Sequence, residues 1–147
     1  MPTHETEAEA SALVARWIEA FNTHNVDAIV GLYAESAELY DSGMKRPRQG
    51  RADIEQWFTT RFRAMPSLRY TPTSQLFEQE QAVVFWTAQG QTPRLLRQPW
   101  LARAFQVDGV SHFIIRDGRI QKQRGYYDHL AIVERVLPPL KWLPSRL

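Results

Sequence analysis

The sequence predicts an α+β domain in which helices come first and a curved antiparallel sheet follows. Apolar residues recur at helical spacing up to Met65, and after Pro66 the spacing changes to alternation. Two Asp-Gly pairs then interrupt the alternating part, as tight turns between strands do. The length of 147 residues suits one domain with its own core, which we place at residues 1–137, followed by a C-terminal tail at 138–147.

The N-terminal third is expected to form three helices. Apolar residues from Glu7 to Phe21 share one helical face, and the polar residues 22–25 end this helix. Asn25 is the predicted N-cap of a second helix at 26–33. A third helix is predicted at 52–65, where Pro66 closes it.

The strands are expected to be short and rich in β-branched and aromatic residues. They are predicted at 37–41, 68–70, 74–77, 82–90, 100–107, 110–116 and 119–127. Residues 42–50 have the composition of a loop. The last three strands should form a meander, with hairpin turns at Asp108-Gly109 and Asp117-Gly118. A final helix is predicted at 130–137.

Composition excludes several classes of function. The chain has no cysteine, and its four histidines are scattered, so we expect no metal site and no thiol chemistry. The basic residues of the C-terminal half alternate with apolar ones instead of forming a run, which argues against a nucleic-acid partner. The polar N-terminus is not a signal peptide, and no apolar stretch could span a membrane; we therefore expect a cytoplasmic protein with no membrane partner.

Four segments carry a family resemblance: ALVARWIEAFNTHNVDAIVGLYAESAELYDSG, GRADIEQWF, DGRI and RGYYD. Together they resemble the nuclear transport factor 2-like superfamily, which includes ketosteroid isomerase and the SnoaL-like polyketide cyclases. The resemblance covers about residues 8–137. It implies a cone-shaped, curved antiparallel sheet wrapped around helices, an internal apolar pocket, and a homodimer formed through the sheet. Because this fold hosts enzymes and binding modules alike, the resemblance says little about function.

Two aspartates are candidate catalytic residues. Asp41 resembles the general base of ketosteroid isomerase, and a carboxylate among aromatic residues suits proton transfer. The alternative for Asp41 is a turn in which its carboxylate caps backbone amides. Asp128 resembles the acid/base aspartate of the SnoaL-like cyclases, and its alternative is an N-cap for the helix predicted after it.

The predicted ligand-binding residues are aromatic side chains with polar tips, together with one serine. They are Trp17, Tyr33, Tyr40, Trp57, Trp86, Ser111 and Tyr127. Trp17 and Ser111 stand where the isomerase has the tyrosine and the aspartate of its oxyanion hole, so steroid isomerase activity is not expected. His112 should face away from the pocket, toward the dimer interface, if Ser111 faces into it.

These observations leave two functions open. The first is a domain that binds a small, mostly apolar molecule and acts as a cofactor-independent cyclase or isomerase, by proton transfer beside a carbonyl on Asp41 or Asp128. The second is a non-catalytic small-molecule-binding or dimerisation module of the same fold. The two differ in whether a carboxylate and a hydrogen-bond donor reach the same bound molecule.

Overall fold

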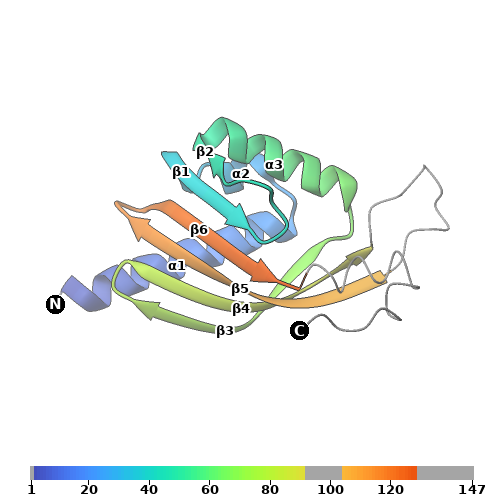
Figure 1. Cartoon of the computed structure of the whole chain (residues 1–147). Coiled ribbons are helices and arrows are strands. Elements are labelled where there is room, and N and C mark those ends of the chain that lie inside the picture. The colour runs from blue at the N-terminus through green and yellow to red at the C-terminus, as the bar shows by residue number, and fades with distance from the viewer. Residues whose placement is uncertain (1, 92–103, 129–147) are drawn as a thin grey trace.

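A single sheet of six strands carries the fold, with its helices on one side (Figure 1). The computed structural model describes residues 2–91 and 104–128. Within them the elements are α1 (Pro2–Asn22), α2 (Val26–Val30), β1 (Tyr33–Asp41), β2 (Arg48–Gln49), α3 (Gly50–Ala64), β3 (Arg69–Glu78), β4 (Gln81–Gln91), β5 (Ala104–Arg116) and β6 (Arg119–Tyr127). The α+β class predicted from the sequence is confirmed.

The strand order is β2-β1-β6-β5-β4-β3, with β2 and β3 at opposite edges, so the sheet does not close on itself. The sheet is curved (Figure 1). Neighbouring strands from β3 to β6 pair antiparallel in chain order. The pair β1–β6 is parallel, and the sheet is therefore mixed where the resemblance implied an antiparallel one. This pairing matters for function because it sets the end of β1, with Asp41, beside Gly125 of β6.

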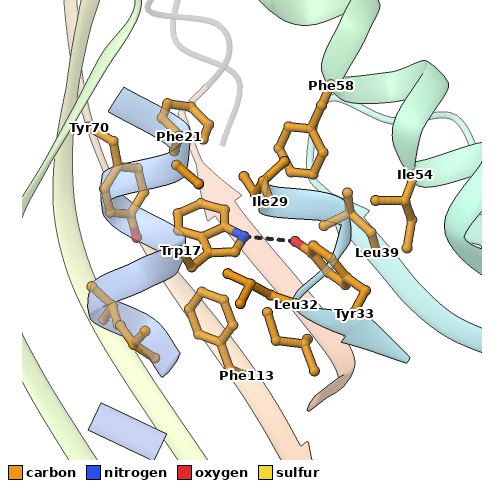
Figure 2. Close-up of a cluster of buried hydrophobic side chains, with 14 of the residues drawn as sticks. Trp17, Phe21, Ile29, Leu32, Tyr33, Leu39, Ile54, Phe58, Tyr70 and Phe113 are labelled. Carbon is orange, nitrogen blue, oxygen red and sulfur yellow. Dashed lines mark hydrogen bonds between the residues drawn. The ribbon is translucent and has the colours of Figure 1, made fainter. Parts of the chain in front are cut away.

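The core lies between α1, α3 and the inner face of the sheet, and aromatic rings fill its centre (Figure 2). The indole of Trp17 contacts the rings of Phe21, Tyr70 and Phe113, with centroids 5.2–5.5 Å apart. Burying one such side chain contributes roughly 1.5–3 kcal/mol. The helical spacing in the sequence therefore corresponds to a buried face of α1. On this face the Trp17 side chain is only 3% exposed.

The helices follow the prediction, with shifted boundaries. Asn25 is confirmed as the N-cap of α2, because its side-chain oxygen accepts a hydrogen bond from the Ala28 N–H at 3.0 Å. That helix ends at Val30 and not at Tyr33, since Tyr33 pairs with Ile120 of β6 and begins β1. The strand predicted at 37–41 is accordingly longer, and the loop predicted at 42–50 contains the short strand β2.

The hairpin predicted at Asp108-Gly109 is wrong. Strand β5 runs unbroken from Ala104 to Arg116, and Gly109 pairs with Trp86 on one side and Tyr127 on the other. A glycine inside a strand often marks a close approach of another group, and here that group is the Trp86 indole. The second hairpin is confirmed: Asp117 and Gly118 have φ angles of 54° and 67°, as a type I′ turn requires.

The two extended pieces predicted after Pro66 form one strand, β3, in which Pro72 is tolerated because the strand lies at the sheet edge. The predicted helix 130–137, the tail 138–147 and the start of the strand at 100–107 lie outside the described residues. Within residues 2–91 and 104–128, no helix is both long and apolar enough to cross a membrane.

Candidate functional site

A cavity of about 90 Å³ lies between α1, α3 and the inner face of the sheet. Its walls are mostly aromatic and aliphatic, with Trp17, Phe58, Trp86 and Phe105 among them. All the predicted ligand-binding residues except Tyr33 line it: Trp17, Tyr40, Trp57, Trp86, Ser111 and Tyr127. Tyr33 is fully buried, and its hydroxyl is hydrogen-bonded to two residues that line the cavity, Trp17 and Gln123.

Asp41 lines the cavity from the end of β1 and also caps the turn that follows. Its Oδ1 accepts a hydrogen bond from the Gly43 N–H at 2.8 Å, and its Oδ2 lies 3.2 Å from Nη2 of Arg61. The hydroxyl of Tyr127 lies 3.5 Å from Oδ1, which is a long and weak contact. Asp41 therefore caps a turn, as one interpretation of the sequence predicted, and it also lies at the cavity wall, as the catalytic interpretation requires.

Arg61 was not among the predicted site residues, because no role was assigned to the polar residues of the helix predicted at 52–65. The guanidinium of Arg61 lies 4.4 Å from the centre of the Trp57 ring, and that of Arg48 lies 5.4 Å from it. Arg48 is held in turn by Asp53 at 3.3 Å. The position four residues after Trp57 was the available signal, because such residues share a helical face.

Tyr127 brings a second polar tip to Asp41. Burial raises the pKa of the Tyr127 hydroxyl, and the negative charge of Asp41 raises it further. The phenol therefore stays protonated at neutral pH and presents a donor to the carboxylate. Its neighbour Asp128 is exposed and is not among the described residues that line the cavity, so the structure does not bring the two candidate aspartates together.

A second polar group sits on strands β3, β4 and β5. The Trp86 indole N–H donates to the Ser111 hydroxyl oxygen at 2.9 Å. The hydroxyl of Tyr70 lies beside Ser111, but it is buried and makes no well-formed hydrogen bond with a described residue. Burial raises the pKa of Tyr70, which keeps this hydroxyl protonated. Tyr70 had no predicted role, because an extended piece of two or three residues carries no signal for a site.

A third polar group joins Trp17, Tyr33 and Gln123. The Trp17 indole N–H donates to the Tyr33 hydroxyl at 2.9 Å (Figure 2), and this hydroxyl donates to Oε1 of Gln123. Gln123 is 4% exposed and lines the cavity. It too was missed, since one glutamine in a strand of alternating residues is ordinary.

Gly125 lies between the side chains of Asp41 and Ser111. A Cβ at this position would stand 3.5 Å from Cβ of Asp41 and 3.6 Å from Oγ of Ser111. One carbon atom would therefore contact both residues. The absence of a side chain leaves that space to the cavity, which Gly125 lines.

Metal chemistry has no evident site in this part of the chain. Within residues 2–91 and 104–128, no three His, Asp or Glu side chains cluster in a way that could hold a metal ion. His112 faces away from the cavity, as expected, and its Nε2 lies 2.8 Å from the side-chain oxygen of Gln81.

The sequence pattern of the SnoaL-like domain matches residues 14–123, about three-quarters of the chain. The chain belongs to the SnoaL-like domain family. This places it in the nuclear transport factor 2-like superfamily, as the resemblance implied. No curated protein matches the chain.

Solved structures of SnoaL-like proteins share the fold. A putative SnoaL-like polyketide cyclase from Jannaschia sp. CCS1 has a TM-score of 0.79 and 18% identity, over 89% of this chain and 93% of that one. A protein with a ketosteroid isomerase-like fold from Catenulispora acidiphila DSM 44928, in complex with trimethylamine, has a TM-score of 0.75 and 19% identity. The match covers 90% of this chain and 97% of that one. The epoxide hydrolase/cyclase-like enzyme SalBIII, described in pyran ring formation in the polyether salinomycin, has a TM-score of 0.73 and 22% identity. The match covers 85% of this chain and 95% of that one. At these identities the likeness is one of fold.

Proposed function

We propose that this SnoaL-like domain binds a small, mostly apolar carbonyl compound in the cavity and moves a proton beside the carbonyl. The observation that carries the proposal is the placement of Asp41 and Ser111 on either side of the space above Gly125. A ligand held there would lie against the side chain of Asp41 and the hydroxyl group of Ser111. General acid–base catalysis needs this arrangement, and it requires no redox or organic cofactor.

Asp41 would act as the base. Its carboxylate takes the proton from the carbon beside the carbonyl, and the electrons of the C–H bond move to the carbonyl oxygen, forming an enolate. Where the ligand has a C=C bond next to the carbon that loses the proton, the product is a dienolate, and return of the proton to its γ carbon gives an isomer. Attack of the enolate carbon on a second carbonyl of the same ligand closes a ring, and the carboxylic acid of Asp41 protonates the alkoxide formed. SalBIII and the putative cyclases support ring closure as the reaction class only through their shared fold.

Arg61 would hold the Asp41 carboxylate in place. The two groups lie 3.2 Å apart, and both are about one-fifth exposed. The ion pair fixes the Asp41 side chain at the cavity wall, where a bound ligand would meet it.

The proposal is tested by deuterium exchange into 2-indanone, whose CH₂ groups lie beside a ketone, followed by NMR in D₂O. The wild-type protein should accelerate the exchange, and Asp41→Asn should reduce it by roughly 10²-fold or more, the usual size of a general-base contribution. Asp128→Asn is the matched control and should leave the rate unchanged. If the protein binds 2-indanone and the wild type does not accelerate the exchange, the domain is a binding module. Acceleration that Asp41→Asn leaves intact would rule out Asp41 as the base.

A further inference from the structure

Helix α3 brings a positive charge to the cavity wall, the guanidinium of Arg61. Among residues 2–91 and 104–128, Arg61 is the one cationic side chain that lines the cavity, and Asp41 is the one anionic side chain. The rest of the lining is mostly aromatic and aliphatic. A charge in such surroundings is costly unless acceptors satisfy it, so the partners of Arg61 indicate what this wall can bind.

Two contacts fix the position of the Arg61 guanidinium and leave part of it accessible. It lies 4.4 Å from the centre of the Trp57 ring, and its Nη2 donates to Oδ2 of Asp41 at 3.2 Å. The Tyr127 hydroxyl interacts electrostatically with both charged groups. Within residues 2–91 and 104–128, the guanidinium makes one hydrogen bond at standard geometry, and none of its nitrogens is buried without a partner. Nε and Nη1 of Arg61 are therefore accessible donors, since a guanidinium has five N–H groups in a planar fork.

The surroundings of Arg61 hold more positive than negative charge. A second guanidinium, that of Arg48, contacts the same indole ring at 5.4 Å. Asp53 pairs with Arg48 at 3.3 Å and with Arg46 at 3.1 Å, so one carboxylate serves two guanidinium groups. Nε of Arg48 is buried and has no hydrogen-bond partner among the described residues, which indicates that acceptors are in short supply here. With Asp41 paired to Arg61, these linked groups comprise three cations and two anions, and a monoanionic ligand would balance the excess charge.

A carboxylate fits both the accessible donors and the excess charge. Arginine binds carboxylates through two parallel hydrogen bonds, which the planar fork matches in geometry. The contact with Trp57 holds the Arg61 guanidinium in place before a ligand arrives, so less freedom is lost on binding. A ligand carboxylate on this fork would lie beside Asp41, because both would share one guanidinium.

We propose that Arg61 anchors a carboxylate group of the ligand at the α3 wall of the cavity. The ligand is then a mostly apolar organic acid, with its acid group at Arg61 and its apolar body against the aromatic walls. This rests on the proposed function in taking the cavity as the ligand site, and it adds a charged group and its position to the ligand. The shared guanidinium sets the bound acid next to the proposed base.

The test compares two molecules of one shape, indane-2-carboxylate and the neutral indane-2-carboxamide, at pH 7. Their binding to the full chain is followed by the ¹⁵N–¹H signals of the Trp57 indole and of Nε of Arg61. The wild type should bind the carboxylate roughly tenfold or more tightly than the carboxamide, as expected for hydrogen bonds between charged groups.

Arg61→Gln removes the charge and should abolish the preference for the carboxylate. Arg63→Gln is the matched control, because it removes a charge from an exposed position of the same helix and should leave the preference unchanged. Arg61→Lys keeps the charge without the planar fork and should retain only part of the preference. Since lysine can still pair with Asp41, this variant carries the test if Arg61→Gln does not fold.

Asp41→Asn separates the two roles at this wall. Loss of the competing carboxylate removes a repulsive charge and frees more of the Arg61 fork, so indane-2-carboxylate should bind more tightly than it does to the wild type. The affinity for indane-2-carboxamide should stay the same. A site that recognises only the apolar skeleton would show no such gain.

Equal affinity of the wild type for the carboxylate and the carboxamide, or a full preference in the folded Arg61 variants, would overturn this inference. The proposed proton transfer fails in a different way, if the carboxylate binds with the expected preference and the wild type does not accelerate deuterium exchange into 2-indanone. Binding of neither indane derivative nor 2-indanone contradicts both.

Discussion

The Trp86 indole lies directly over the backbone of Gly109. A Cβ at position 109 would stand 2.4 Å from Cζ2 of Trp86 and 2.7 Å from the Tyr126 carbonyl oxygen, closer than atoms approach. The glycine therefore permits the indole position from which Trp86 donates to Ser111. Gly109, a residue inside the sheet, thus determines where the hydrogen bond between Trp86 and Ser111 lies in the cavity wall.

Gly109→Ala should displace Trp86 and break its hydrogen bond to Ser111. We expect a loss of roughly 1–3 kcal/mol in the free energy of unfolding, the range for overpacking a well-filled core. Urea denaturation measures the loss, and the indole signal of Trp86 should shift. Gly118→Ala tests the turn instead and should leave that signal in place, because nothing lies within 4 Å of a Cβ there. A Gly109→Ala protein with wild-type stability and an unmoved Trp86 signal contradicts the packing described here.

Tyr70→Phe and Tyr33→Phe form a matched pair. Among residues 2–91 and 104–128, Tyr70 has no hydrogen-bond partner at standard geometry, so removal of its hydroxyl should leave stability unchanged or raise it by up to about 1 kcal/mol. Loss of the Tyr33 hydroxyl leaves both the Trp17 N–H and the Gln123 oxygen unpaired, at a cost of roughly 2–3 kcal/mol. Thermal and urea denaturation of both variants checks the difference. Equal destabilisation would mean that Tyr70 is paired in solution.

Asp53 gives the fold a defined pH dependence. The N–H of Gln49 holds the pKa of this carboxyl below its usual range, with help from Arg46 and Arg48. Because the folded pKa lies below the unfolded one, the stabilisation is present above about pH 4 and is lost as pH falls through the folded value. Asp53→Asn should therefore cost about 1 kcal/mol at pH 7 and progressively less below pH 4. Glu55→Gln on the same helix is the control, and a deficit that does not change with pH argues against this role of Asp53.

The outer face of the sheet is where we expect a second copy of the chain to bind. Phe85, Val110 and Tyr126 pair across β4, β5 and β6, and the two aromatic side chains are 43% and 46% exposed. Two-fold symmetry would place this row against itself. Light scattering should give a dimer mass for the wild type and a monomer mass for Phe85→Arg. A monomer mass for the wild type at micromolar concentration removes this expectation.

Local patterns predicted the elements of this fold and few of their contacts. Helical spacing located α1 and α3, and the Asp117-Gly118 turn gave β6 its correct start. The same dipeptide at Asp108-Gly109 led to a wrong hairpin prediction. The glycine there is required by the Trp86 indole, which comes from another strand. The aromatic cavity walls were predicted because large side chains signal burial on their own. Arg61, Tyr70 and Gln123 gain their meaning from partners on other elements, which no local pattern contains.

The central claim is that Asp41 and Ser111 act on one ligand across the space above Gly125, and Gly125→Ala tests it most directly. The added methyl group would make ordinary contacts of 3.5–3.9 Å, so the protein should fold with unchanged or slightly higher thermal stability. The methyl group would also occupy the space that the ligand needs. We predict that Gly125→Ala loses both the binding of 2-indanone and its deuterium exchange while remaining folded. A folded Gly125→Ala protein that exchanges 2-indanone at the wild-type rate would contradict the account.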